Sequence, residues 1–155
     1  MSAHQRDAAA SMAARYQGAA SATAGGTGDA TEVSGGWIDR QNFLSAKLII
    51  NYKATLADTE TISVAANLQD ASSSGGTGAA DYGTALASTV QATSDGGTTE
   101  TGVVELDFDL SGAKQYIQAQ FTPDLSASGT DTAIVSAVLV LAGNDNPPVT
   151  ARANS

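Results

Sequence analysis

Cysteine is missing from this 155-residue chain, and histidine occurs once, at His4. Without cysteine there are no disulfides, thiolate metal sites or cysteine nucleophiles. A single histidine near the N-terminus also cannot supply a Ser-His-Asp triad or a metal site with several histidine ligands. We therefore expect a protein that is not an enzyme, that holds no cofactor or metal, and that folds through packing and hydrogen bonds.

Basic residues are also scarce, since seven Lys and Arg stand against 16 Asp and Glu and give a formal net charge of −9. Nucleic-acid binding needs a clustered basic surface, and membrane-surface binding needs a basic run. The basic residues of this chain are scattered, so we expect neither partner. The N-terminus also lacks the features of a signal peptide, and no apolar run approaches the ~20 residues of a membrane span. These patterns predict a soluble product made in the cytoplasm.

Large apolar side chains are sparse in the first part of the chain, where Gly, Ala, Ser and Thr dominate. Such a segment buries too little surface to offset the entropy of ordering, so we expect residues 1–34 to form a flexible arm. Within it, Asp7–Tyr16 has good helix formers, although so short a helix needs a partner. We predict three parts: an arm at 1–34, a folded domain at 35–146 and a C-terminal tail at 147–155.

Alternation of apolar and polar residues marks the strands of the folded domain. In Val103–Leu110 the apolar residues Val104, Leu106 and Phe108 share one face, and acidic residues share the other. Similar patterns or apolar runs predict further strands at Ala46–Lys53, Thr61–Leu68, Tyr82–Val90, Lys114–Phe121 and Ala133–Ala142.

The segments between these strands are rich in Gly, Ser and Asp, which favour turns. We expect Leu56–Thr59 to be a hairpin connection and Pro123 to end its strand. Several short strands at this spacing, without a convincing helix between them, predict an all-β fold. The expected architecture is an antiparallel β-sandwich or jelly roll with a flexible N-terminal arm.

Carboxylates are the remaining groups that could carry chemistry. Glu105, Asp107 and Asp109 share one predicted strand face, and two suitably spaced carboxylates can hydrolyse a glycosidic bond. A carboxylate-only glycosidase is therefore an open alternative, although such alternation more often keeps one face of a strand in water. Loop carboxylates could also bind calcium, but acidic loops are more often turn-formers and nothing has EF-hand spacing. The calcium candidates are Asp70, Asp81, Asp95, Asp124 and Asp131.

Apolar residues near the flexible Gly35–Gly36 pair are candidates for contacts with other proteins. Trp37 is the only tryptophan, and it could belong to the core or anchor a contact. We name Trp37, Ile38 and Phe43 as the candidate contact residues. Ala133–Ala142 is nearly continuously apolar, as in a central strand that is buried on both faces or that carries a subunit contact.

The C-terminal half follows a pattern seen in a known family. Glu105–Gly143 contains an apolar strand, a short turn before Lys114, Tyr116 and Ile117, a small-polar loop, and an Ala/Val-rich strand that ends in Leu-Ala-Gly. A tail with Pro147 and Pro148 follows, and the stretch Gly-Trp-Ile-Asp at 36–39 and the strands near 48–52 and 62–68 are similar too. Over roughly residues 30–148 the chain resembles the capsid decoration, or cement, proteins of tailed bacteriophages.

The resemblance implies a virion structural protein that binds the major capsid protein at the capsid surface and stabilises the shell. A second expected partner is the chain itself, as a homo-oligomeric dimer or trimer. No functional residue carries over, because the shared pattern is one of strands and turns. The alternatives are a tail or head-fibre component and, from another class, a carbohydrate-binding module. The latter needs exposed aromatic platforms, which one Trp, four Tyr and three Phe supply only thinly.

Overall fold

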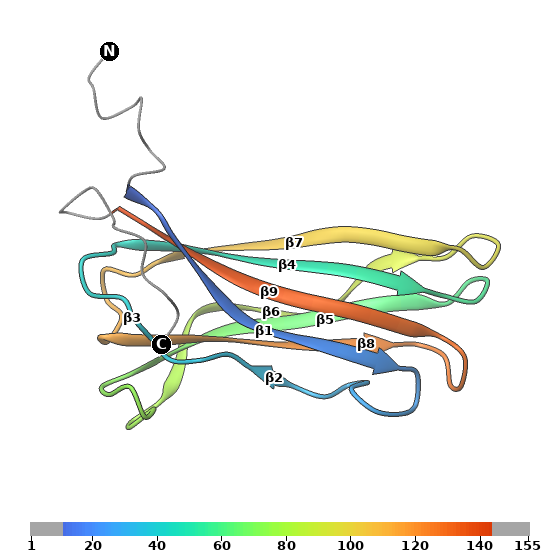
Figure 1. Ribbon diagram of the computed structural model, residues 1–155, viewed down its shortest axis with the longest axis horizontal. Helices are drawn as coiled ribbons and strands as arrows, with labels where there is room; N and C mark the ends of the chain where they lie inside the picture. Colours follow the sequence, from blue (N-terminus) through green and yellow to red (C-terminus); the bar gives the residue numbers. More distant parts are fainter. Residues whose placement is uncertain (1–10, 144–155) are drawn as a thin grey trace, which may run out of the picture.

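The computed structural model describes residues 11–143, which form two antiparallel sheets packed face to face (Figure 1). Sheet A contains, in spatial order, β1 (Ala13–Thr23), β9 (Thr132–Ala142), β4 (Ser45–Thr55) and β7 (Thr99–Asp109). Sheet B contains β2 (Val33–Ser34), β8 (Tyr116–Leu125), β5 (Thr61–Ala71) and β6 (Ala80–Thr93), and the short β3 (Ile38–Asp39) also pairs with β8. None of the described residues form a helix that is long and apolar enough to cross a membrane.

The strand order is that of a jelly roll, which confirms the predicted fold class. The strands run lengthwise and most connections cross from one sheet to the other at the ends of the sandwich (Figure 1). The expected hairpin at Leu56–Thr59 is therefore wrong, because β4 pairs with β7 and β9 whereas β5 pairs with β6 and β8. The local sequence indicates a turn there, but it does not say which strand each neighbour pairs with.

The core lies between the sheets and is built from every second residue of the long strands. Leu48 and Ile50 of β4 and Ile62 and Val64 of β5 have no exposed surface, as their alternation predicts. Burying one such side chain contributes about 1.5–3 kcal/mol to folding. The apolar layer contributed by both sheets is therefore the main source of stability.

Strand β8 continues past the residue that was expected to end it. Pro123 pairs with Val64 of β5, and the strand runs on to Leu125. The backbone carbonyl of Pro123 accepts a hydrogen bond from the N–H of Ala30, so the main-chain groups of Pro123 point away from β5. Proline is tolerated in a strand where no ladder donor is required. The missing N–H faces a loop, and the ladder to β5 stays intact.

The expected flexible arm at 1–34 is also corrected, because residues 13–23 form edge strand β1 of sheet A. This strand pairs with β9 from Ala13, opposite Leu141, to Thr23, opposite Thr132. The helix expected at Asp7–Tyr16 is replaced by a strand from Ala13 onward, and residues 1–10 lie outside the described part. Composition measures how much apolar surface a segment can bury, but an edge strand is also held by main-chain hydrogen bonds to its neighbour.

A buried glutamine fixes β1 to the opposite sheet. Gln17 lies at a bulge in β1 and is 1% exposed. Its Oε1 accepts a hydrogen bond from the backbone N–H of Ala119 in β8 at 2.7 Å, and its Nε2 donates to the carbonyl of Gly36 at 3.2 Å. Between β2 and β3 the chain leaves β8 without a regular strand partner, and Gln17 supplies a hydrogen bond there. The sandwich therefore includes residues that precede the expected boundary at residue 35.

Candidate functional site

The three predicted contact residues do not form one exposed surface. Phe43 is a core residue with 6% exposure, and Ile38 pairs with Ile117 through β3 and packs partly against the core. Trp37 is half-buried, and its indole lies against Gly76, where a Cβ would approach Nε1 to 2.8 Å. Of the three, only Trp37 and Ile38 keep part of their surface in solvent.

The carboxylate row of β7 lies on the outward face of sheet A, as the alternation predicts. Lys47 of the neighbouring β4 holds two of these groups, with its Nζ 2.9 Å from Asp107 and 3.1 Å from Glu105. Hydrogen bonds to Asp107 and then to Glu105 raise the pKa of the Lys47 ammonium. The pKa of Asp109 is lowered because its carboxylate accepts a hydrogen bond from the backbone N–H of Ser111 at 2.9 Å. A general acid needs a raised pKa, so the environment of Asp109 is the opposite of the one that a general acid requires.

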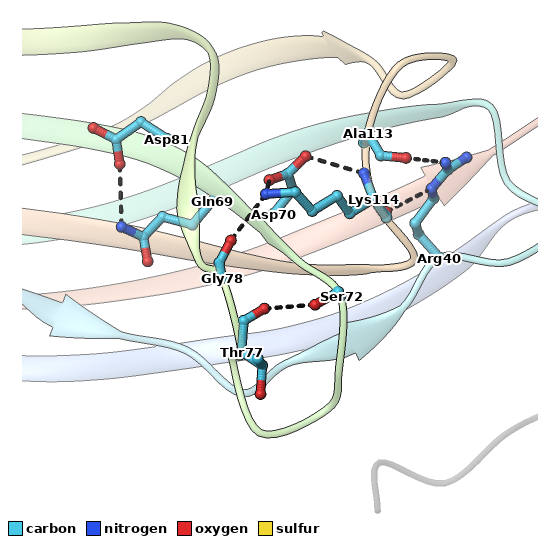
Figure 2. Close-up of polar contacts among 9 residues, drawn as sticks. All are labelled: Arg40, Gln69, Asp70, Ser72, Thr77, Gly78, Asp81, Ala113 and Lys114. Carbon is cyan, nitrogen blue, oxygen red and sulfur yellow. Dashed lines mark hydrogen bonds and ion pairs between the residues drawn. The ribbon is translucent and has the colours of Figure 1, made fainter.

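Asp70, one of the calcium candidates, is the centre of a polar clasp at the end of β5 (Figure 2). Its carboxylate accepts hydrogen bonds from the backbone N–H and the Nζ of Lys114, both at 3.0 Å. The same Nζ donates to the carbonyl of Gly78 at 2.9 Å, and Arg40 donates to the carbonyls of Ala113 and Lys114. Three segments distant in sequence are thereby joined, so the role of Asp70 here is to fix loops.

Two further calcium candidates also have protein partners. Asp81 accepts hydrogen bonds from the side-chain amides of Asn67 and Gln69, at 2.9 and 3.1 Å. Asp131 is 2% exposed; one of its oxygens accepts a hydrogen bond from the backbone N–H of Ala57 at 2.9 Å, while the other has no partner among residues 11–143. Within residues 11–143 no three His, Asp or Glu side chains are grouped to hold a metal ion, and His4 lies outside this range.

The outward face of sheet B is polar and internally hydrogen-bonded. Gln120 of β8 accepts from Asn67 of β5 at 3.1 Å and donates to Glu32 at 2.7 Å and to Ser34 at 2.9 Å. Asn67 also reaches Asp81 of β6, so the network spans the sheet from the β2 edge to the β6 edge. Several polar side chains on this face thus have partners within the chain.

Exposed large apolar side chains are by contrast concentrated on sheet A, where they lie beside the carboxylate row of β7. Six large hydrophobic side chains are exposed among residues 11–143, and five of them lie on sheet A or just before one of its strands. They are Met12, Tyr16, Leu44, Val103 and Ile134. We call the outward-facing side chains of β1, β9 and β4 the β1–β9–β4 face; its largest apolar members are Tyr16, Ile49, Ile134, Val138 and Val140.

The three strands of the β1–β9–β4 face contain no acidic residue at all. Their charged residues are Arg15, Lys47 and Lys53, whereas the whole chain carries 16 Asp and Glu. Soluble monomers rarely expose large contiguous apolar patches, and larger ones mark interaction sites. The apolar run of β9 indicated part of this surface in the sequence. Because residues 1–34 were interpreted as an arm, β1, one of the three strands of the face, was missed.

Comparisons with known proteins give little further support. No family model matches the chain, and no curated protein matches it. Among solved structures it is similar to the "Structure of infectious bursal disease virus Gx strain" (TM-score 0.44, 12% identity) and to the "Crystal structure of infectious bursal disease virus VP2 subviral particle" (TM-score 0.43, 11% identity). Each match covers 88% of this chain and 34% of the other, so this chain spans about a third of those proteins. These TM-scores are too low to establish a common fold, and the jelly-roll assignment rests on strand order and register.

Proposed function

We propose that this chain is a virion structural protein, a decoration or cement subunit on the head of a tailed bacteriophage. The observation that carries the proposal is a jelly roll with one outward surface that is free of carboxylates and exposes several large apolar side chains, the β1–β9–β4 face. Such a face suits a protein that works by contacting other proteins. The step from an assembly subunit to a phage head rests on the resemblance of Glu105–Gly143 to that family, a stretch that forms β7, β8 and β9.

The hydrogen bonds that fix the loops support a rigid structural role. Asp131 joins the β4–β5 connection to the β8–β9 loop through Ala57, and the Asp70–Lys114 pair joins the start of β8 to the end of β5. Asp29 accepts hydrogen bonds from the backbone N–H groups of Gly25 and Leu125, at 2.7 and 2.8 Å. A subunit with fixed loops loses little conformational entropy when it binds a shell, which favours tight attachment.

Trp37 is our candidate for the contact with the major capsid protein. It is partly exposed beside sheet B and is not among the core residues, and aromatic side chains are frequent interface anchors. In a binding assay with undecorated heads, Trp37→Ala is expected to weaken attachment by at least ~30-fold, a typical effect for an anchor residue. Val90→Ala, at an exposed position of β6, is the control and should bind like the wild type. Equal binding by Trp37→Ala would remove Trp37 from the interface.

The proposed role is tested by mass spectrometry of purified particles separated into heads and tails. Many copies of this chain in the head fraction, in a fixed ratio to the major capsid protein, are the expected result. A few copies with the tails would instead support the alternative of a tail or fibre component. Absence from both fractions would overturn the virion role.

A further inference from the structure

We propose that the β1–β9–β4 face binds a second copy of this chain, with a two-fold axis running along β9. This surface differs from the Trp37 region, and the inference does not depend on the virion role. Its occupant follows from three properties of the face, namely its charge, its pattern across the strands and its size.

Charge favours a second copy on this face over any other. Two copies that each carry a net charge of −9 repel one another, and the repulsion is strongest where carboxylates oppose carboxylates. The β1–β9–β4 face is built from three adjacent strands without a single Asp or Glu. On sheet A the carboxylates begin only at β7, with Glu105, Asp107 and Asp109 pointing outward. Copies that meet on β1, β9 and β4 therefore avoid opposed carboxylates.

The face is self-complementary about an axis along β9. Strand pairing places Tyr16 of β1 and Ile49 of β4 on either side of Val138 of β9. A two-fold axis along β9 stacks Val138 on its own copy and lays Tyr16 of each copy over Ile49 of the other. The same operation places Ile134, which is 61% exposed, against its own copy. An isologous interface requires this kind of matching of a patch with itself.

The same axis leaves the acidic strand in water. Sheet A has the order β1, β9, β4 and β7, so β1 of one copy covers β4 of the other, and β7 projects beyond the edge. Glu105 and Asp107 keep their solvent, and their ion pairs hold the Lys47 ammonium on the β7 side of the covered strand β4. Charged groups at the rim of an interface, unlike charges buried in its centre, carry no large desolvation cost.

The area is sufficient for a specific but modest dimer. Three strands spaced ~4.8 Å apart, with a rise of ~3.3 Å per residue, cover roughly 14 by 36 Å, or about 500 Å² per copy. The strand length in this product is 11 residues for each of β1, β4 and β9. About 1,000 Å² in total reaches the lower limit at which an interface can be specific, and because interfaces of this size are typical of weak association we expect a Kd of about micromolar or weaker.

The first test measures the mass of the full chain in solution by analytical ultracentrifugation over a range of concentrations. The wild type is expected to be a dimer at ~100 µM, well above a micromolar Kd. Ile134→Glu places a carboxylate at the two-fold axis and should raise the Kd at least ~30-fold. Val90→Glu introduces the same charge at a similarly exposed position of β6, outside the face, and should leave the dimer intact. A monomeric wild type, or a dimer that Ile134→Glu leaves unchanged, overturns the proposal.

The second test locates the two-fold axis by cross-linking. Because the chain has no native cysteine, only the introduced cysteine can react. Ile134→Cys is expected to yield covalent dimers with a short bis-maleimide, because equivalent residues on β9 face each other. Val90→Cys should form the same non-covalent dimer without being cross-linked under these conditions. Efficient cross-linking of Val90→Cys, or none of Ile134→Cys, would contradict an axis along β9. A dimer that is absent from phage particles would overturn the virion role alone, and a head protein that is monomeric in solution would overturn this inference alone.

Discussion

The outward faces of the two sheets differ in the side chains that they expose. On sheet B, amide and carboxylate side chains such as Asn67, Gln120 and Asp81 bond to one another across three strands. On sheet A, the corresponding positions carry apolar side chains such as Tyr16 and Ile134, which are 56% and 61% exposed. Several polar side chains of sheet B are satisfied inside the chain, whereas sheet A exposes apolar side chains that no other described residue covers.

The difference indicates which surface of this protein gains free energy from association with another chain. A hydrogen-bonded face gains little from a partner, because each contact would replace a bond that already exists. An apolar face gains from burial, at about 25 cal/mol per Å² of apolar surface removed from water. We therefore expect substitutions on sheet B to affect folding, and substitutions on the β1–β9–β4 face to affect association.

The largest effect is expected at Gln17, which ties the edge of sheet A to β8. Gln17→Leu removes the acceptor for the backbone N–H of Ala119 and the donor to the carbonyl of Gly36, and it leaves the buried N–H of Ala119 without this partner. We expect the free energy of unfolding to fall by about 2 kcal/mol, within the range for a buried unsatisfied group. Urea denaturation measures it, and Ser21→Ala, at an exposed position in the same strand, should cost almost nothing. A Gln17→Leu variant as stable as the wild type would mean that β1 is held without this link.

A reciprocal pair of substitutions tests the comparison directly. Gln120→Leu removes bonds to Asn67, Glu32 and Ser34 and should lower the free energy of unfolding by about 1–2 kcal/mol. Ile134→Gln, on the exposed side of β9, should change the free energy of unfolding of the monomer by no more than about 0.5 kcal/mol. Both are measured by urea denaturation at high dilution, where the dimer is dissociated. Equal costs for the two variants would show that the faces do not differ in the way described.

The smallest effect concerns Asp109, at the acidic margin of sheet A. The Asp109 carboxylate accepts a hydrogen bond from the backbone N–H of Ser111, and this bond holds the pKa of Asp109 below the ordinary value of 3.8. Because the pKa of Asp109 is lower in the folded state than in the unfolded state, this group stabilises the fold at pH values above its ordinary pKa. The contribution is lost as the pH falls through the lowered pKa. Titration of the carboxyl carbon by NMR measures the shift. Ser111→Ala keeps the backbone N–H but removes the weaker side-chain hydrogen bond, so it should move the pKa part of the way back. A wild-type pKa at or above 3.8 would refute the assignment.

The sequence predicts the strands of this protein better than their partners. Alternation correctly identifies β4, β5 and β7, because each has one face in the core and one in water. The role of Pro123 was misjudged, since a proline ends a ladder only when its missing N–H faces a paired strand. The candidate site was predicted less well: Phe43 proved to be core, and the exposed apolar face was not assembled.

The amino-acid sequence by itself determined the all-β character, the positions of most strands and the acidic net charge, because these follow from local periodicity and composition. Only the tertiary structure decided that residues 13–23 are a strand, and that β1, β9 and β4 form one face without carboxylates. The physical reason is that strand pairing joins segments more than a hundred residues apart, as Gln17 and Ala119 show. No local pattern records such pairings, so a surface made from three separate strands becomes visible only once the chain is folded.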